Sequence, residues 1–224
     1  MAKKHINPLL KIIVIGTVIF LIYLVSKKII EMELISKIIL PSAPGRISAS
    51  DDSDYYTDLA TSYKTPLAQR IDIMAANLNI PKSDYLIGTM FLESSLQYPK
   101  KNSIGALGYI QMLPDPGKTY KTIGGKQWEM SVIESMSETD YLDLMEQYFS
   151  DMVKSGKKLN SFLDVYLAVL DPSAVGKPDD YVLPDWIAKA NSAYADANGK
   201  ITKAGLLSVL TDRISKSGLP INIT

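Results

Sequence analysis

Apolar residues gather first near the N-terminus, where their pattern predicts a helix with no polar face. Residues 9–25 read LLKIIVIGTVIFLIYLV, and Lys11 is the only charged residue among them. A helix that is apolar on all sides is buried in a large core or in a membrane. These seventeen residues reach the lower end of the length that spans a bilayer. We therefore predict a transmembrane anchor over residues 9–28.

Lysines lie at both ends of the predicted anchor and bear on its orientation. Residues 1–8 form a short basic tail, and Lys27 and Lys28 follow the apolar run. A cleavable signal peptide would have a shorter apolar region followed by small residues, and here lysines follow instead. The slight excess of lysine on the N-terminal side favours an N-terminus inside the membrane. We expect an uncleaved, single-pass anchor with the rest of the chain outside.

The composition changes after the predicted anchor. Residues 29–40 keep apolar side chains at helical spacing, and residues 41–54 are rich in Pro, Gly, Ser and Asp. The second composition is typical of a flexible connection between structured parts. We predict a stalk and linker over residues 29–54, followed by one folded domain over residues 55–224.

The folded domain is predicted to be mainly α. Apolar residues recur at helical spacing in several segments, and each segment follows a residue that commonly opens or caps a helix. The expected starts of these helices are Pro66, Ser83, Ser137, Asn160 or Ser161, Pro184 and Thr202. The helix from Pro184 is expected to run to Asn198. Residues 115–136 are expected to form a long irregular loop that walls a cleft.

Charge and composition exclude several kinds of chemistry. The 24 Lys and Arg residues balance the 24 Asp and Glu residues, so nothing indicates electrostatic binding of nucleic acid. Cysteine is absent, and the single histidine is His5 in the N-terminal tail. The folded domain therefore has no Ser-His-Asp triad, no thiol nucleophile and no Cys- or His-ligated zinc. Carboxylates remain as its acid and base groups.

Glu93 is the first candidate for such a group. It comes at the end of an apolar helical segment, residues 85–93, which reads YLIGTMFLE. Partial burial raises the pKa of a carboxyl group because the ionised form loses more hydration than the neutral form. An acid of this kind keeps its proton near neutral pH and can protonate a glycosidic oxygen. A single Glu at a helix end is more often a surface residue, so the following residues decide between these interpretations.

The residues after Glu93 form a recognisable pattern. Ser94 follows directly, residues 105–111 read GALGYIQ, and Pro114 comes three positions later. This pattern resembles the lytic transglycosylase and goose-type lysozyme group of the lysozyme-like superfamily, whose signature is E-S, a variable loop, then G-A-x-G-L-x-Q and usually M-P. Tyr109 and Leu113 take places that usually hold Leu and Met. The resemblance implies a lysozyme-like α domain in which Glu93 is the catalytic acid and base.

The same resemblance implies a substrate and a product. The substrate would be the β-1,4 bond between N-acetylmuramic acid and N-acetylglucosamine in peptidoglycan, and the product would carry a 1,6-anhydro ring. No metal or organic cofactor would be needed. Gln111 offers both a donor and an acceptor to an amino sugar, and Gly105 and Gly108 let the backbone turn sharply and approach it. The expected substrate contacts in this part of the chain are Ser94, Ser95, Gly108, Tyr109 and Gln111.

A second part of the family pattern is matched only at its end. In the related enzymes a helix ends in A-Y-N-A-G-P-x-A-V, and Pro172, Ala174 and Val175 match its tail. The Tyr and Asn of that pattern fall at Ala168 and Val169. We expect Tyr166 or Tyr181 to supply the missing hydroxyl to the substrate, and the sequence does not choose between them.

Two alternatives to a lytic transglycosylase stay open. A muramidase of the same fold would use water as the nucleophile, with Asp115 or Asp171 as the second carboxylate. A non-catalytic, membrane-tethered protein that binds the cell wall would need no acid at Glu93. A wall-cleaving domain anchored by residues 9–28 fits either the lipid membrane of a bacteriophage virion or a bacterial inner membrane facing the periplasm. The sequence leaves the oligomeric state open.

Overall fold

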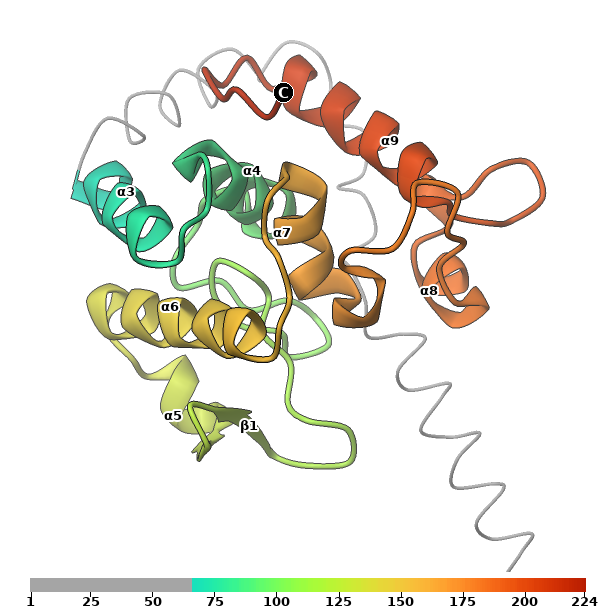
Figure 1. Ribbon diagram of the computed structural model, residues 1–224. Coiled ribbons are helices and arrows are strands. Elements are labelled where there is room, and N and C mark those ends of the chain that lie inside the picture. The colour runs from blue at the N-terminus through green and yellow to red at the C-terminus, as the bar shows by residue number, and fades with distance from the viewer. Residues whose placement is uncertain (1–65) are drawn as a thin grey trace, which may run out of the picture.

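Two apolar helices, α4 (Ser83–Ser94) and α7 (Phe162–Leu170), pack against each other in the middle of the structure (Figure 1). The computed structural model describes residues 66–224. Helices α3 (Pro66–Asn77) and α9 (Lys203–Lys216) also contact α4. Because most side chains of α4 and α7 are buried, both are core helices rather than amphipathic surface helices.

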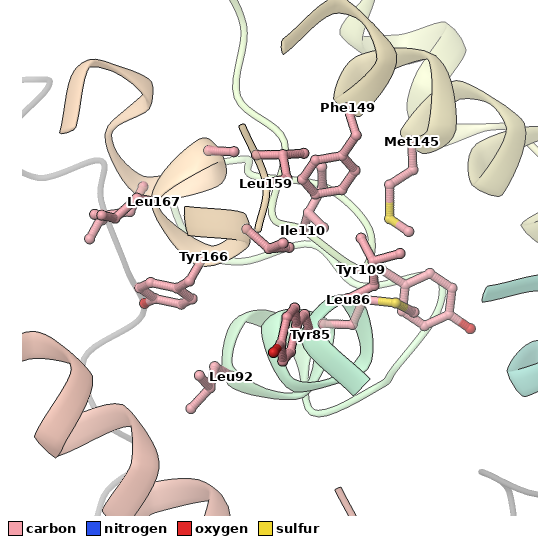
Figure 2. Close-up of a cluster of buried hydrophobic side chains, with 14 of the residues drawn as sticks. Tyr85, Leu86, Leu92, Tyr109, Ile110, Met145, Phe149, Leu159, Tyr166 and Leu167 are labelled. Atoms are coloured by element: carbon pink, nitrogen blue, oxygen red, sulfur yellow. The ribbon is translucent and has the colours of Figure 1, made fainter. Parts of the chain in front are cut away.

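The core is formed by large apolar side chains from several helices. In Figure 2 these side chains gather around Ile110, which belongs to residues 105–111. They are Tyr85 and Leu86 from α4, Tyr166 from α7, and Met145 and Phe149 from α6 (Glu138–Lys154). All of them are buried. Burying one such side chain contributes roughly 1.5–3 kcal/mol to stability. The core therefore fixes α4, α6 and α7 relative to one another.

Three predicted helix starts are confirmed by their caps. The Ser137 hydroxyl accepts a hydrogen bond from the Asp140 N–H at 3.2 Å and donates one to the Asp140 carboxylate at 2.6 Å, at the start of α6. Ser161 makes the same pair of hydrogen bonds with Asp164 at the start of α7, and the Thr202 hydroxyl accepts one from the Gly205 N–H at 3.0 Å at the start of α9. Pro66 begins α3 as predicted. These starts were predictable because a cap is a local interaction of the chain.

The prediction that Ser83 caps α4 is wrong by one residue. Lys82 occupies the cap position with an extended backbone and provides no side-chain hydrogen bond, and Ser83 is the first helical residue. Burial of α4 against α3, α7 and α9 stabilises this helix without a side-chain cap.

The prediction of an irregular loop over residues 115–136 is also wrong. Strands β1 (Tyr120–Ile123) and β2 (Lys126–Glu129) form an antiparallel hairpin in which Tyr120 lies opposite Glu129, and α5 (Met130–Glu134) follows directly. The two turn residues, Gly124 and Gly125, have φ angles of 61° and 72°. A two-residue hairpin turn needs positive φ at both positions, and Gly-Gly provides it. This local signal was present in the sequence.

The segment after Pro184 is shorter and more broken than predicted. Helix α8 spans Asp185–Ala190, and a 3₁₀ turn, η2, spans Ser192–Tyr194. Between them Asn191 leaves helical geometry, and its side-chain amide donates a hydrogen bond to the Ile187 carbonyl at 3.0 Å. Asn commonly competes for backbone hydrogen bonds in this way. The predicted single helix to Asn198 therefore ends at Ala190.

The mainly α class is confirmed for residues 66–224, where helices predominate and β1 and β2 form a single small sheet. A short 3₁₀ turn, η1 (Pro172–Ala174), follows α7. None of the helices within residues 66–224 has the length and hydropathy needed to cross a bilayer. The predicted tail, anchor and linker, at residues 1–8, 9–28 and 29–54, lie outside the described residues.

Candidate active site

Glu93 lies in the last turn of α4 and is 5 % exposed. Its Oε1 atom is buried and has no hydrogen-bond partner. Burial raises the pKa of Glu93 from its ordinary value near 4.5 to about 8, and Tyr166 and Arg213 offset this only in part. A carboxyl group with this pKa is mostly protonated at pH 7. Glu93 is thus an acid that keeps its proton near neutrality.

Side chains from four other elements act electrostatically on Glu93. Tyr166 comes from α7, Tyr194 from η2, Arg213 from α9 and Tyr141 from α6, and all four interact electrostatically with its carboxyl group. The Tyr166 hydroxyl is buried and near enough to favour the ionised form of Glu93, yet it makes no hydrogen bond of ordinary geometry. Burial and the charge of Glu93 raise the pKa of Tyr166 well above 10, so its phenol stays protonated.

The segment at residues 105–111, called here the motif loop, is a tight backbone turn. The N–H of Leu107 donates to the Met112 carbonyl at 3.0 Å, and the N–H of Met112 donates back to the Leu107 carbonyl at 2.7 Å. Gly105 and Gly108 have φ angles of 85° and 70°, in the region that favours glycine. The two glycines are therefore required by the turn itself.

Tyr141 holds the motif loop against α6. Its hydroxyl donates a hydrogen bond to the Leu107 carbonyl at 3.0 Å, and its ring packs on Gly108. A Cβ atom at Gly108 would lie 2.2–2.5 Å from the Tyr141 ring and hydroxyl. The space that a Cβ atom would take at Gly108 is therefore filled by Tyr141, and the contact of its backbone with a sugar stays a prediction. Glycine at this position lets the loop approach α6.

The two glycines of the motif loop give a matched pair of substitutions. Gly105→Ala meets open space and suffers only backbone strain, so it should lower the free energy of unfolding by about 1–2 kcal/mol. Gly108→Ala adds a collision with the Tyr141 ring and should lower it by about 2–5 kcal/mol. Chemical denaturation measures both. Equal losses for the two variants would contradict the packing described for Tyr141.

Gln111 ends the motif loop with a strained backbone and a free acceptor. Its φ angle is 47°, and its side-chain amide donates a hydrogen bond to the Gly108 carbonyl at 2.9 Å. Its Oε1 atom is buried without a partner, and the residue is 8 % exposed. An unpaired buried acceptor costs roughly 1–3 kcal/mol and calls for an explanation. A ligand that donates an N–H or O–H to this oxygen would supply the missing hydrogen bond.

Strained residues cluster beside Glu93 and Gln111. Within residues 66–224, positive φ angles at non-glycine residues occur at Asn79, Ser95, Leu96 and Gln111. Ser95 and Leu96 follow the end of α4 directly, and Gln111 closes the motif loop. Each such residue costs about 1–3 kcal/mol and tends to occur where a site needs a special backbone shape. Backbone strain therefore occurs in the two segments that contain Glu93 and Gln111.

Other predicted contact residues have structural partners. The Ser94 hydroxyl donates to the Met90 carbonyl at 2.9 Å within α4, and Ser95 ends that helix in a left-handed conformation. Tyr109 is buried, packs on Tyr98 and Tyr141, and donates its hydroxyl to Glu138.

Of Tyr166 and Tyr181, only Tyr166 is placed beside Glu93 among the described residues. Tyr181 is half-buried, and its carbonyl accepts a hydrogen bond from the Lys203 N–H at 3.0 Å at the start of α9. No contact described for residues 66–224 brings Tyr181 to Glu93, so the position of the two residues favours Tyr166.

The two candidate second carboxylates have their own partners. Asp115 lies 3.3 Å from Lys121 and accepts a hydrogen bond from the Thr122 N–H at 2.9 Å, beside the hairpin. Asp171 accepts hydrogen bonds through Oδ1 from the N–H and hydroxyl of Ser173, and its Oδ2 atom is buried and unpaired. Within the described part of the chain, no cluster of three or more Asp, Glu, His or Cys residues has the arrangement of a metal site.

Sequence reasoning missed Arg213 and Tyr194. Arg213 follows Leu206 and Leu210 at helical spacing and precedes Ile214, all three of which are buried. A charged residue on the apolar side of a helix was a signal that it faces something buried. Tyr194 gave no such signal, because its position depends on how α8 ends.

Comparisons of the chain with protein-family models, with curated proteins and with solved structures found no match, so its function is inferred from the site and from the sequence motif.

Proposed function

We propose that the chain is a lytic transglycosylase that cleaves the β-1,4 bond between N-acetylmuramic acid and N-acetylglucosamine in peptidoglycan. The observation that carries this proposal is the burial of Glu93, which raises its pKa to about 8. A residue with this pKa can act as an acid at neutral pH and, once ionised, as a strong base. The E-S and G-A-x-G-x-x-Q motif supplies the substrate class by resemblance.

In the first step Glu93 gives its proton to the glycosidic oxygen. The bond between this oxygen and C1 of the muramic acid breaks, and the N-acetylglucosamine leaves as a neutral alcohol. Positive charge develops at C1, and the acetamido group of the same sugar would stabilise it. The protein supplies the proton, and the substrate supplies the nucleophile for the charged carbon.

In the second step the Glu93 carboxylate takes the proton from the C6 hydroxyl of the same sugar. The C6 oxygen forms a bond to C1 and closes a 1,6-anhydro ring. Glu93 regains its proton, so the acid is ready for another turnover and no water is consumed. One carboxyl group therefore performs both proton transfers.

The surroundings of Asp115 support a single-acid mechanism, because Asp115 lies beside the hairpin and pairs with Lys121 at 3.3 Å. Asp171 is hydrogen-bonded to Ser173 through Oδ1 and keeps a buried, unpaired Oδ2 atom, so it stays the second carboxylate that a muramidase would use. A glycosidase that activates water requires a second carboxylate on the opposite face of the sugar. A mechanism in which the substrate supplies the nucleophile has no such requirement.

Gln111 and Tyr166 are proposed to contact the substrate. The unpaired Oε1 atom of Gln111 suits the N–H of an acetamido group or a sugar hydroxyl. The unpaired Tyr166 hydroxyl can donate a hydrogen bond to Glu93 when it is ionised, or to a sugar oxygen. A lysozyme-like fold for the domain belongs to the same proposal, as does its tethering by residues 9–28 to a virion or bacterial inner membrane.

The proposal is tested by digesting purified peptidoglycan with the full-length chain in detergent and identifying the released fragments by mass spectrometry. Fragments ending in 1,6-anhydro-muramic acid are expected. Fragments heavier by one water molecule would show hydrolysis and identify a muramidase instead. Binding to peptidoglycan without release of any fragment would indicate a wall-binding protein and contradict the enzymatic function.

A further inference from the structure

Three tyrosine rings, called here the tyrosine cluster, pack together at the N-terminal end of α6. Tyr98 follows α4, Tyr109 belongs to the motif loop, and Tyr141 lies in the first turn of α6. The ring centres of Tyr98 and Tyr141 are 5.2 Å apart, those of Tyr98 and Tyr109 are 5.5 Å apart, and those of Tyr109 and Tyr141 are 6.2 Å apart. Rings at such separations attract one another beyond the area that they bury. The cluster therefore joins the segment after Glu93, the motif loop and α6.

The hydroxyl groups of the cluster attach it to the start of α6. The Tyr98 hydroxyl donates a hydrogen bond to the Met136 carbonyl at 2.7 Å, and the Tyr109 hydroxyl donates one to Glu138. Both acceptors lie within two residues of Ser137, the cap of α6. Two segments of the site are thus connected to the same helix end.

Tyr141 fixes the motif loop on both sides of its turn. Its side chain is 0 % exposed, and its hydroxyl donates to the Leu107 carbonyl at 3.0 Å and accepts from the Ile110 N–H at 3.5 Å. Its ring fills the space beside Gly108. Because Leu107 precedes Gly108 and Ile110 follows it, a single side chain holds the loop at three points.

Gln111 depends on this loop for its position. Its side-chain amide donates to the Gly108 carbonyl at 2.9 Å, and its backbone N–H donates to the same carbonyl at 3.3 Å. Its φ angle of 47° is an unfavourable conformation that the surrounding structure has to maintain. Both hydrogen bonds end on the residue against which the Tyr141 ring packs. The placement of the unpaired Oε1 atom of Gln111 is therefore coupled to Tyr141.

We infer that Tyr141 is a positioning residue, which fixes the motif loop so that the Oε1 atom of Gln111 stays in place to accept a hydrogen bond from the substrate. The inference rests on the proposed function, in which Gln111 contacts the substrate. Tyr141 is fully buried and acts through Gln111. A contact made alike with the bound substrate and the transition state contributes to KM and not to kcat. Loss of positioning should therefore appear in KM.

The test compares two conservative substitutions on α6 in the full-length chain in detergent. Tyr141→Phe keeps the ring and removes the hydroxyl. Tyr148→Phe is the matched control, because Tyr148 is also buried and its hydroxyl donates to a backbone carbonyl, that of Ala168, at 2.7 Å. Each variant loses one buried hydrogen bond, so their urea midpoints should fall by similar amounts. With peptidoglycan as substrate, Tyr141→Phe should raise KM about three- to tenfold with little change in kcat, and Tyr148→Phe should leave both unchanged.

A double-mutant cycle shows whether Tyr141 acts through Gln111. Gln111→Ala alone should raise KM, and adding Tyr141→Phe to Gln111→Ala should raise it no further. If Tyr141→Phe changes KM by the same factor with and without the glutamine, or leaves KM at the value of Tyr148→Phe, the inference is overturned.

Hydrogen exchange separates a failure of the inference from a failure of the proposed function. The Met112 N–H donates to the Leu107 carbonyl at 2.7 Å, which is the carbonyl that the Tyr141 hydroxyl also binds. Relative to the amides of α4, the Met112 N–H should exchange roughly five- to tenfold faster in Tyr141→Phe and unchanged in Tyr148→Phe. A wild-type protein that cleaves no peptidoglycan would overturn the proposed function. Exchange at Met112 that is the same in Tyr141→Phe and the wild type would overturn the role of Tyr141.

Discussion

Replacing Glu93 with glutamine should lower the rate of peptidoglycan cleavage by roughly 10²–10⁴-fold, because general acid and base catalysis contribute about this much. Glutamine keeps the shape of the side chain and cannot give up or take up the proton. The fold should be retained, because glutamine is uncharged and has the same shape as the protonated acid that is buried at this position. A turbidity assay with isolated cell walls measures the rate, and circular dichroism checks the fold.

The matched control for this substitution is Glu129→Gln. Glu129 is exposed on β2 and accepts a hydrogen bond from the Thr119 hydroxyl at 2.9 Å, so its replacement removes a carboxylate outside the site. This variant should cleave peptidoglycan like the wild type. If Glu93→Gln retains full activity, the assignment of the acid is wrong.

The second large effect concerns stability rather than activity. Burial raises the pKa of Glu93 to about 8 in the folded protein, whereas the unfolded chain has a value near 4.5. Between these two values the folded protein holds a proton that the unfolded chain has released. The free energy of unfolding must therefore fall as the pH rises from about 4.5 to 8. Above pH 8 the full loss of stability from ionising Glu93 is present.

Comparing the wild type with Glu93→Gln isolates this effect. The variant has no proton to lose at this position, whereas all other groups titrate alike in the two proteins. Relative to the variant, the wild type should lose on the order of 3–5 kcal/mol between pH 4 and pH 9. Urea denaturation at several pH values measures both curves. A difference that does not change with pH would mean that Glu93 titrates as an ordinary exposed carboxyl group.

Local interactions explain which parts of the fold were predictable. Ser137, Ser161 and Thr202 begin helices because each hydroxyl accepts a hydrogen bond from an N–H three residues later. Such a cap depends only on neighbouring residues, so the sequence indicates it directly. The hairpin at Gly124 and Gly125 was equally local and was missed because the Gly-containing stretch over residues 115–136 was interpreted as an irregular loop.

The site was predictable only in part. Glu93 and Gln111 belong to one short motif, and the apolar segment before Glu93 already indicated burial. The choice of Tyr166 over Tyr181 depends on how α7 packs against α4, which is a tertiary contact. Arg213 reaches the site from the last helix, and its hydrogen bond to Tyr194 depends on the end of α8 at Asn191. No spacing rule connects such distant segments.

The structure gives Gly108 a packing role that the motif did not indicate. The motif predicted a glycine that lets the backbone approach a sugar. In the structure the position next to it is occupied by the Tyr141 ring, whose hydroxyl also binds the Leu107 carbonyl. The glycine therefore holds the motif loop against α6. Its carbonyl also holds the Gln111 side chain through a hydrogen bond of 2.9 Å.

The central claim is that Glu93 keeps its proton at neutral pH because it is buried. The measurement that tests it most directly is the NMR titration of the wild-type protein labelled with ¹³C at the glutamate carboxyl groups, with the Glu93 signal identified by its absence in Glu93→Gln. The account predicts a midpoint near pH 8. A midpoint near pH 4.5 would mean that the carboxyl group is ionised at neutral pH and would contradict its role as the acid.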